Sequence, residues 1–294
     1  MRILLANDDG IYSHGLAAMA RVLGRMGEVC IVAPATEQSG VGPGITFLTP
    51  LTVKKVYRHG SLWGYAVEGT PVDCVKIGID KLMGGRPDIV VSGINNGLNV
   101  GINVLYSGTV AAAQEASWQG ITSFAISTQF VTANQGDKVE KAAELAGELV
   151  SGLLERNSRP GALFNINIPF SALEPGADLV PDIVPVDMTP HWMNYEERHD
   201  PMNRRYFWVA DRPSMKGAGG SETVSDMKSV ASGKIAITPL SVNLTHFPMV
   251  EEMAAWQFKP RDGYKVPENM ESGAPDIECS RWIERIPDAG ESPR

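Results

Sequence analysis

The chain has 294 residues, of which 43% are hydrophobic and 20% are charged, as in globular proteins that bury at least one sizeable core. Its formal net charge of -8 argues against broad electrostatic binding to nucleic acid or to an anionic membrane surface. We therefore expect a small-molecule partner, and neither a nucleic-acid polymer nor a membrane.

The first half of the chain alternates short apolar runs with amphipathic stretches. This alternation predicts an α/β fold with a mostly parallel sheet flanked by helices. Glycines and prolines between the runs mark turns and one long loop over residues 35–50. The elements expected in chain order are a strand at 2–6, a helix at 16–23, a strand at 29–34, a hairpin at 51–57 and 63–67, a helix at 72–82 with Thr70 as its N-cap, a strand at 88–95, a helix from 110, a strand at 124–127 and a helix at 138–154.

The regular alternation fades in the second half of the chain. Residues 163–169 alternate apolar and polar side chains, as a half-exposed strand does, and residues 234–240 predict one more strand. Residues 172–225 are too rich in large apolar groups for a solvated linker, so we expect an inserted hairpin or oligomerisation segment that packs on the core or on a second subunit. We expect an α/β domain over residues 1–250 and an irregular arm over residues 251–294.

The cysteines and the start of the chain predict a cytoplasmic protein. The chain begins with a strand, without the basic start and longer apolar stretch of a secretory signal, and no apolar run is long enough to span a bilayer. The three cysteines, Cys30, Cys74 and Cys279, are widely spaced, which favours reduced thiols over a disulfide framework.

The clearest functional signal is the pair of adjacent carboxylates, Asp8 and Asp9, between the first strand and Gly10. Two negative charges side by side repel, so a nearby cation is a natural reason to tolerate them. Taken alone, such acids are more often solvated turn residues than metal ligands. The interpretation as a cation site therefore depends on what else lies at the same place.

Three more polar clusters are expected at the same edge of the sheet, because the carboxyl ends of parallel strands meet there. Each cluster alone has a simpler interpretation as a flexible loop, a turn or a helix N-cap. Their joint occurrence after successive strands favours a single site. The clusters are Ser39; Asn95 and Asn96; and Ser107, Gly108 and Thr109.

The expected site is built from oxygen ligands. Two carboxylates, a hydroxyl and a carboxamide suit one divalent ion such as Mg²⁺ or Mn²⁺ better than zinc or copper. The five histidines show no metal-ligand spacing, and His14 is interpreted as a surface residue rather than a catalytic acid. Beside such an ion, Ser107, Gly108 and Thr109 would present hydroxyls and helix-start N–H groups to a phosphate, which predicts phosphoryl chemistry.

Five motifs between residue 1 and about residue 130 resemble, in order, those of the SurE family of 5'-nucleotidases. Weaker similarities follow at 165–169, 200–208 and 238–240, although Met202 stands where the family pattern has glycine and the chain beyond about 250 has no counterpart. The five motifs cover residues 7–10, 34–40, 69–75, 92–99 and 106–113.

The resemblance implies a Rossmann-like α/β enzyme that uses a metal ion to hydrolyse nucleoside 5'-monophosphates. It also implies side activity on 3'-nucleotides, other phosphoesters or short polyphosphate. The metal ligands of the family fall on Asp8, Asp9, Ser39 and Asn95 of this chain. Carboxy-terminal extensions exchanged between subunits would make the protein a homodimer or homotetramer.

Three hypotheses describe the chemistry. In the leading one, a metal-activated water attacks phosphorus while Asp8 or Asp9 orients the water, and Asn96 with the 107–109 segment stabilises charge on the phosphoryl oxygens. In the second, an aspartate is the nucleophile and an aspartyl-phosphate forms, although enzymes of the haloacid-dehalogenase type space their acids as Asp-x-Asp. The third is a non-enzymatic phospho-acceptor signalling domain, whose usual short length fits this chain poorly.

Overall fold

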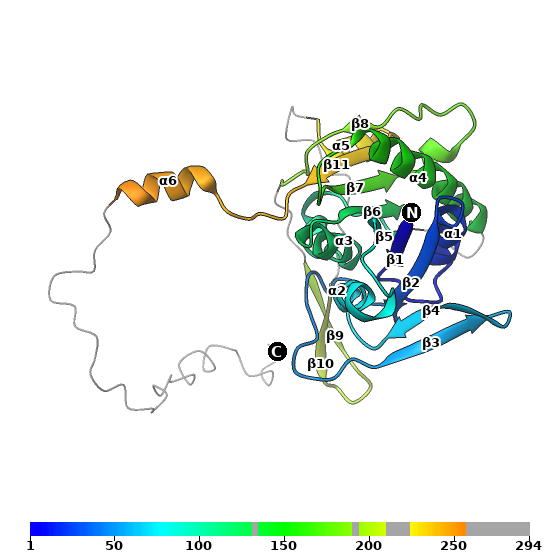
Figure 1. Cartoon of the computed structure of the whole chain (residues 1–294). Coiled ribbons are helices and arrows are strands. Elements are labelled where there is room, and N and C mark those ends of the chain that lie inside the picture. The colour runs from blue at the N-terminus through cyan, green and yellow to red at the C-terminus, as the bar shows by residue number, and fades with distance from the viewer. Residues whose placement is uncertain (131–134, 190–193, 210–223, 257–294) are drawn as a thin grey trace, which may run out of the picture. The chain divides into compact units, whose positions relative to one another are not determined.

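A computed structural model describes residues 1–130, 135–189, 194–209 and 224–256 of the chain (Figure 1). The chain divides into two compact units, Met1–Asn243 and Leu244–Arg294, so the boundary falls before the expected position at residue 250.

The second unit contains helix α6 (Phe247–Ala255), which corrects the expectation that the arm is irregular from residue 251. The helix forms because the His246 imidazole accepts a hydrogen bond from the Met249 N–H at 3.0 Å and so caps its first turn. Residues 257–294 of the expected arm, including Cys279, lie outside the described residues.

The first unit is built on a central sheet. Among the described residues this sheet has nine strands in the order β3-β4-β2-β1-β5-β6-β7-β11-β8. Neighbouring strands in the run β4-β2-β1-β5-β6-β7 are parallel, whereas the β3/β4 and β7/β11 pairs are antiparallel. The predicted Rossmann-like, mostly parallel α/β fold is thus confirmed. The strands are β1 (Arg2–Ala6), β2 (Glu28–Pro34), β3 (Val53–Arg58), β4 (Ser61–Val67), β5 (Ile89–Asn96), β6 (Thr122–Thr128), β7 (Leu163–Ile168), β8 (Asp182–Ile183) and β11 (Ala236–Leu240).

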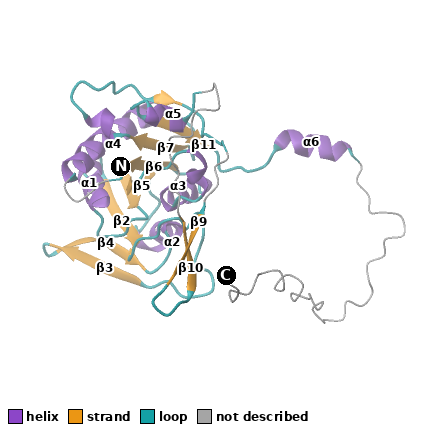
Figure 2. Ribbon diagram, turned by 180° about the vertical axis from the view of Figure 1, so that it is seen from behind, coloured by secondary structure: helices purple, strands orange, loops and turns teal. Residues whose placement is uncertain are grey.

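Helices cover both faces of this sheet (Figures 1 and 2). On one face α1 packs against α4, and on the other α2 packs against α3. The helices and short turns of the unit are α1 (His14–Leu23), α2 (Pro71–Ile77), η1 (Gly78–Leu82), η2 (Gly101–Leu105), α3 (Gly108–Trp118), α4 (Gly136–Arg156), η3 (Phe170–Leu173) and α5 (Asp226–Ala231).

The alternation of side chains along β1 explains why the sheet has two buried faces. Ile3 and Leu5 belong to the core shared with α1 and α4, whereas Leu4 and Ala6 belong to the core shared with α2 and α3. All four side chains are inaccessible to solvent. The first strand is therefore central, and whatever follows it in sequence emerges at the middle of the carboxyl edge of the sheet.

A glycine allows α1 to sit close above the end of β5. A Cβ atom at Gly15 would lie 2.2 Å from the carbonyl oxygen of Ile94, a distance that no side chain can adopt. The start of α1 and the end of β5 are thus held in direct backbone contact. This contact fixes one wall of the cavity described below.

Two expectations about local structure are changed by the packing. The helix expected over 72–82 begins as predicted, with Thr70 and Asp73 forming a capping box, but it continues after Ile77 as the wider turn η1. The strand at 163–169 was expected to be half-exposed, which is wrong: β7 is buried because Asn165 and Asn167 turn their carboxamides onto the backbone of Asn99.

The segment 172–225 divides into parts with different surroundings. Val184, next to β8, and Met227 and Val230 of α5 pack into one apolar cluster on the core. The hairpin β9 (Tyr195–His199) and β10 (Arg205–Val209) forms a separate two-stranded sheet whose residues are all exposed. The segment thus contains a hairpin, and none of the residues of β9 and β10 belongs to an apolar core cluster of the described residues.

Two further observations bear on the environment of the protein. Within the described part of the chain, no helix is both long enough and apolar enough to cross a bilayer. Cys30 and Cys74 are free thiols, and Cys74 is buried in the core between β1 and α2.

Candidate active site

Two of the predicted polar clusters follow β1 and β5, the neighbouring strands between which the order of strand addition in the sheet reverses. Strand β1 pairs with β2 on one side and with β5 on the other, so the connections after β1 and β5 diverge at this point of the sheet. Ligands of open α/β sheets bind in the crevice outside such a switch point. Asp8 and Asp9 follow β1 directly, and Asn95 and Asn96 are the last residues of β5.

Asn7 shapes the loop that carries the two carboxylates. Its buried carboxamide accepts a hydrogen bond from the Gly10 N–H at 3.2 Å and donates to the Ser13 hydroxyl at 2.8 Å. Gly10 has a φ of +97°, which favours glycine and turns the chain sharply after Asp9. Asn7 thus positions Asp8 and Asp9, and its place at the strand end beside them is the sequence signal for that role.

Asp8 lies against the N-terminus of α3. Its Oδ2 accepts a hydrogen bond from the Thr109 N–H at 3.1 Å, and its Oδ1 accepts one from the Thr109 hydroxyl at 2.5 Å. Gly108 permits this approach, because a Cβ there would lie 2.9 Å from Asp8 Cβ and 3.0 Å from Pro71 Cγ. Both hydrogen-bond donors of Thr109 are thus bonded to Asp8. The predicted contact of Thr109 with phosphate stays a prediction.

The N-terminus of α3 also has a backbone N–H group that is available to a ligand. The Ser107 hydroxyl oxygen accepts a hydrogen bond from the Val110 N–H at 3.1 Å and caps the helix, as its position predicts. Among the described residues, no acceptor engages the Gly108 N–H. An unpaired N–H at the positive end of a helix is a suitable donor to a phosphate oxygen.

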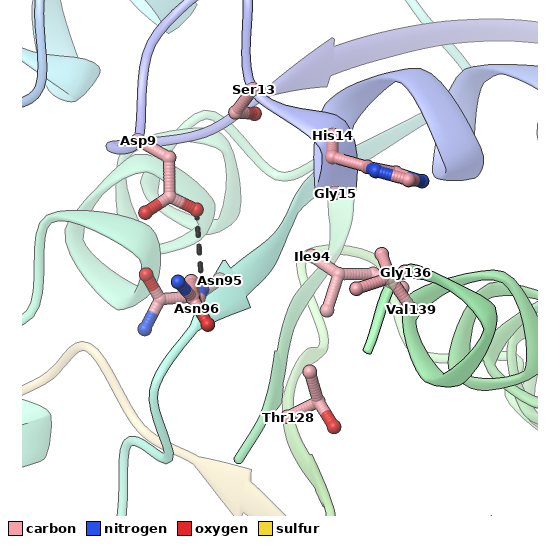
Figure 3. Close-up of a pocket in the computed structure, with 10 residues that line it drawn as sticks. All are labelled: Asp9, Ser13, His14, Gly15, Ile94, Asn95, Asn96, Thr128, Gly136 and Val139. Atoms are coloured by element: carbon pink, nitrogen blue, oxygen red, sulfur yellow. Dashed lines mark hydrogen bonds between the residues drawn. The ribbon is translucent and has the colours of Figure 1, made fainter. Parts of the chain in front are cut away.

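Asp9 is tied to the end of β5. The backbone N–H of Asn96 donates to Asp9 Oδ2 at 3.2 Å (Figure 3). The Asn95 carboxamide donates from Nδ2 to the Gly97 carbonyl at 2.6 Å, and no donor in the described part of the chain engages its Oδ1. The β5/β6 register shifts between Ser92 and Asn95, as at the bulges that often re-aim side chains beside active sites.

Ser39 lies in the loop after β2, next to a residue that contacts the backbone of Asp8. The N–H of the preceding residue, Gln38, donates to the backbone carbonyl of Asp8 at 2.8 Å, which holds the loop against the site. The Ser39 hydroxyl itself is exposed and donates to Glu37 at 2.6 Å. Glu37 is an acid that the sequence interpretation missed, and its charge acts on both Asp8 and Asp9.

The electrostatics of the site favour a cation. Burial raises the pKa of Asp8, against the hydrogen bonds from Thr109 that lower it. Burial and the neighbouring charge of Asp8 raise the pKa of Asp9 to about 7, and the charge of Glu37 raises the pKa of both. Among the described residues, no lysine, arginine or histidine forms an ion pair with either aspartate. Within the described residues, the two aspartates therefore lack a protein counter-charge.

The donor set fits one hard divalent cation. Among the described residues, no three histidine, cysteine, aspartate or glutamate side chains are grouped so that they could hold a metal ion by themselves. Two carboxylates completed by neutral oxygens, such as the unengaged Asn95 Oδ1, are instead the ligands that Mg²⁺ and Mn²⁺ accept.

A cavity of about 260 Å³ opens beside the carboxylates (Figure 3). Asp9, Asn95 and Asn96 line one end of it, and His14 and Val139 line the other. The structure therefore brings Asp8, Asp9, Asn95, Asn96 and the start of α3 to one edge of the sheet, with Ser39 beside them in an adjoining loop.

These features define an α/β protein with paired carboxylates and a helix N-terminus at the switch point of its sheet. Comparison of the sequence with known proteins finds clear relatives. A profile described as "Survival protein SurE" matches residues 3–196. The 5'-nucleotidase SurE of Rhodopirellula baltica is 44% identical over an alignment of 265 residues, which covers 88% of this chain and 100% of that protein. The 5'-nucleotidase SurE 1 of Thermus thermophilus is 40% identical and aligns with 86% of this chain and 97% of that protein.

The fold comparison agrees with the sequences. The crystal structure of the SurE protein from Aquifex aeolicus superposes with a TM-score of 0.71 at 32% identity, covering 87% of this chain and 99% of that one. The chain belongs to the SurE family.

Proposed function

We propose that this protein is a metal-dependent 5'-nucleotidase that hydrolyses nucleoside 5'-monophosphates to nucleoside and phosphate. The observation that carries the proposal is the bonding of Asp8 to Thr109, which places paired carboxylates at the N-terminus of α3. Two relatives with 44% and 40% identity carry the name 5'-nucleotidase, which supports the substrate class.

In this proposal Asp8, Asp9, Ser39 and Asn95 hold one Mg²⁺ or Mn²⁺ ion through oxygen atoms. Such an ion supplies two things when bound: neutralisation of charge on the phosphate and a lowered pKa for a water molecule. The two carboxylates are the centre of this set because, in the described part of the chain, no basic side chain forms an ion pair with either of them.

The other groups of the site orient the attacking water and bind the phosphoryl oxygens. Thr109 fixes Asp8, so Asp8 acts as a positioning group. Asp9 faces the cavity, where its carboxylate accepts a hydrogen bond from the attacking water and so orients that water. The Gly108 N–H, the Ser107 hydroxyl and the Asn96 side chain bind phosphoryl oxygens and stabilise the charge that develops on them.

The direct attack of water is favoured over an aspartyl-phosphate intermediate. Both Asp8 oxygens accept hydrogen bonds from Thr109, which lowers their nucleophilicity. Acid quenching during turnover of a substrate labelled in its phosphate should leave no label on the protein. A labelled aspartate would establish the alternative mechanism.

The proposed activity is tested with protein stripped of metal. Mg²⁺, Mn²⁺, Co²⁺ and Zn²⁺ are restored one at a time, and release of phosphate is measured from nucleoside 5'-monophosphates, 3'-nucleotides, generic phosphoesters and short polyphosphate. We expect Mg²⁺ or Mn²⁺ to restore hydrolysis of the 5'-monophosphates most strongly. Absence of turnover with every ion would overturn the proposal and revive a phospho-acceptor role.

We also propose that the protein is a homodimer or homotetramer. The β9–β10 hairpin exposes Phe207 and Trp208 with 55% and 60% of their surfaces accessible, a pattern typical of an interaction surface. In the second unit, Phe247 of α6 and Trp256, directly after that helix, are likewise exposed. Light scattering should give two or four chains per particle, and Trp208→Ser should lower that number. A monomeric wild-type protein would contradict it.

The free thiols of Cys30 and Cys74 support the further proposal of a cytoplasmic location, where thiols stay reduced. Fractionation of the cells that produce the protein checks it, and recovery from an extracytoplasmic fraction would contradict it.

A further inference from the structure

The cavity beside Asp9 extends well beyond the groups that the proposed phosphate chemistry uses. It runs from Asp9 and Asn96 to the facing starts of α1 and α4, with Ile94 between the two ends (Figure 3). Its volume of about 260 Å³ lies just below the range of about 300–1,000 Å³ common for small-ligand sites. The space therefore suits one compact organic group and not a long polymer.

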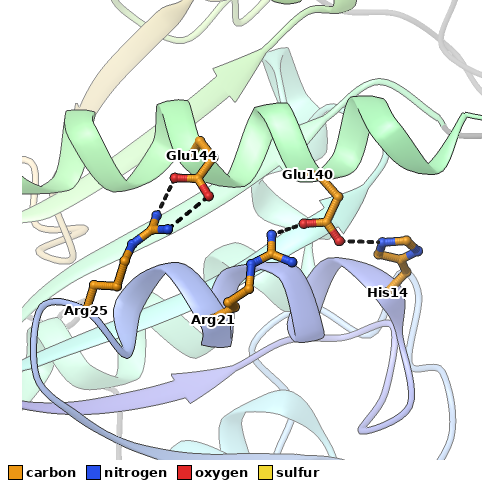
Figure 4. Close-up of polar contacts among 5 residues, drawn as sticks. All are labelled: His14, Arg21, Arg25, Glu140 and Glu144. Carbon is orange, nitrogen blue, oxygen red and sulfur yellow. Dashed lines mark hydrogen bonds and ion pairs between the residues drawn. The ribbon is translucent and has the colours of Figure 1, made fainter.

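The far end of the cavity carries a histidine that is held in place. His14 donates a hydrogen bond from Nε2 to Glu140 Oε1 at 3.0 Å, and Arg21 bonds to the other oxygen of Glu140 (Figure 4). The hydrogen bond from Arg21 lowers the pKa of Glu140, so this side chain stays a carboxylate acceptor. Two elements, α1 and α4, thus fix the orientation of the imidazole ring.

The opposite nitrogen of this imidazole remains available to a ligand. Among the described residues, His14 Nδ1 has no hydrogen-bond partner. Gly136 keeps this edge of the ring accessible, because a Cβ there would lie 3.3 Å from Cε1 and 3.8 Å from Nδ1 of His14. A ring fixed at one nitrogen and open at the other can act as a directional acceptor.

The lining suits a group that is partly apolar and partly polar. Ile94 and Val139 supply apolar surface, and Ser13, Thr128 and His14 supply polar atoms. Small-molecule sites combine a mostly apolar wall with a few polar groups that orient the ligand. A nucleoside, with its flat base and hydroxylated sugar, matches this mixture.

We propose that this cavity binds the nucleoside portion of the substrate and that His14 is a specificity-determining residue there, held by Glu140. The proposal rests on the proposed 5'-nucleotidase function. A phosphate bound at the Asp9 and Asn96 end would direct its ester group along the cavity toward His14. Nδ1 then accepts a hydrogen bond from a sugar hydroxyl or a base N–H group.

The structure offers a matched control. Arg25, two residues after the end of α1, forms an ion pair with Glu144 of α4, with Arg25 Nη1 and Glu144 Oε1 3.2 Å apart (Figure 4). Neither residue lines the cavity. Glu144→Gln therefore removes a comparable arginine–glutamate ion pair, between α4 and the turn that follows α1, but it leaves the cavity untouched.

The experiment compares kcat/KM for adenosine 5'-monophosphate, ribose 5-phosphate and p-nitrophenyl phosphate in the wild-type protein and in His14→Ala, Glu140→Gln and Glu144→Gln, all with Mn²⁺. We expect the ratio of adenosine 5'-monophosphate to p-nitrophenyl phosphate to fall about tenfold in His14→Ala, mainly through KM. Glu140→Gln should lower it by a smaller factor, and Glu144→Gln should keep the wild-type ratio. Circular dichroism verifies that each variant is folded.

The outcomes separate this inference from the proposed function. A fall for ribose 5-phosphate as well as the nucleotide supports a sugar contact, and a fall for the nucleotide alone supports a base contact. An unchanged ratio in both His14→Ala and Glu140→Gln, or an equal fall in Glu144→Gln, would overturn the inference while the phosphatase activity stands. If the wild-type protein hydrolyses none of the three esters, the proposed function itself fails.

Discussion

The carboxylate of Asp8 accepts hydrogen bonds from both donors of Thr109, the backbone N–H at 3.1 Å and the hydroxyl at 2.5 Å. The two residues are 101 positions apart in sequence, so this contact joins the end of β1 to the start of α3. It brings negative charge to the positive end of a helix and leaves Asp9 as the carboxylate that faces the cavity.

Removing the Thr109 hydroxyl should lower turnover or Mn²⁺ affinity without abolishing either. Thr109→Val keeps the N–H bond to Asp8 and the volume of the side chain but deletes the shorter contact. Because groups that orient metal ligands typically contribute 10- to 100-fold, we expect turnover or Mn²⁺ affinity to fall by about that factor. Steady-state kinetics across a Mn²⁺ series measures both. Wild-type values for both quantities would show that the contact is incidental.

Gly108 should tolerate no side chain. In Gly108→Ala the new Cβ would be forced against Asp8 Cβ and Pro71 Cγ, so α3 must move away from β1. We expect phosphatase activity to fall at least about a hundredfold, as when a preorganised donor is displaced.

Gly152→Ala is the matched control for this substitution. Gly152 lies within α4, where a Cβ would make only an ordinary contact at 3.5 Å with Arg156, so alanine should stabilise the helix by about 0.5–1 kcal/mol. Thermal unfolding and activity are measured for both variants. Full activity in Gly108→Ala would refute the proposed role of the close approach.

The metal-free protein should lose stability as pH rises. Asp9 keeps its proton up to about pH 7 when folded but loses it near 3.8, its ordinary pKa, when unfolded. Between these values the folded state binds more protons, so the free energy of unfolding should fall from about pH 4 to pH 7. Urea unfolding across this range measures the slope.

Two additions to the urea experiment identify the group responsible. Asp9→Asn removes the titrating carboxyl and should flatten the slope, and saturating Mn²⁺ should reduce the fall because it stabilises the charged form. A slope that is the same in the wild-type protein and in Asp9→Asn would assign the effect to another group.

The buried asparagines of β7 should be important for stability. Asn167 accepts a hydrogen bond from the Asn99 N–H at 2.8 Å and donates to its carbonyl at 3.1 Å, so Asn167→Ala leaves both backbone groups buried without this partner. We expect a loss of about 2 kcal/mol or more in the free energy of unfolding. Asn157→Ala, in an exposed turn, should cost less than about 1 kcal/mol. Equal losses would contradict this account.

The positions of the strands along the chain and the polar residues at their ends were predictable because they depend on local patterns. Apolar runs gave β1 and β5, and the acids and amides that follow them could only meet at one edge of a parallel sheet. The five motifs then pointed to the family that the comparisons confirm.

What the sequence could not predict depends on tertiary contacts. Polar Asn165 and Asn167 suggested a half-exposed strand, but the partner that allows their burial, Asn99, lies more than sixty residues away. His14 was interpreted as a surface residue, and only the structure shows its bond to Glu140 and its place in the cavity. Glu37 was missed because nothing in its loop reveals its proximity to Asp8 and Asp9.

The central claim is that the two adjacent carboxylates hold one divalent cation for phosphate chemistry. Calorimetric titration of Mn²⁺ into metal-free protein tests it most directly, with the wild-type protein compared with folded Asp8→Asn and Asp9→Asn variants. We predict one ion per chain for the wild-type protein and at least about a tenfold loss of affinity in each variant. Binding of unchanged stoichiometry and affinity in both variants would contradict the claim.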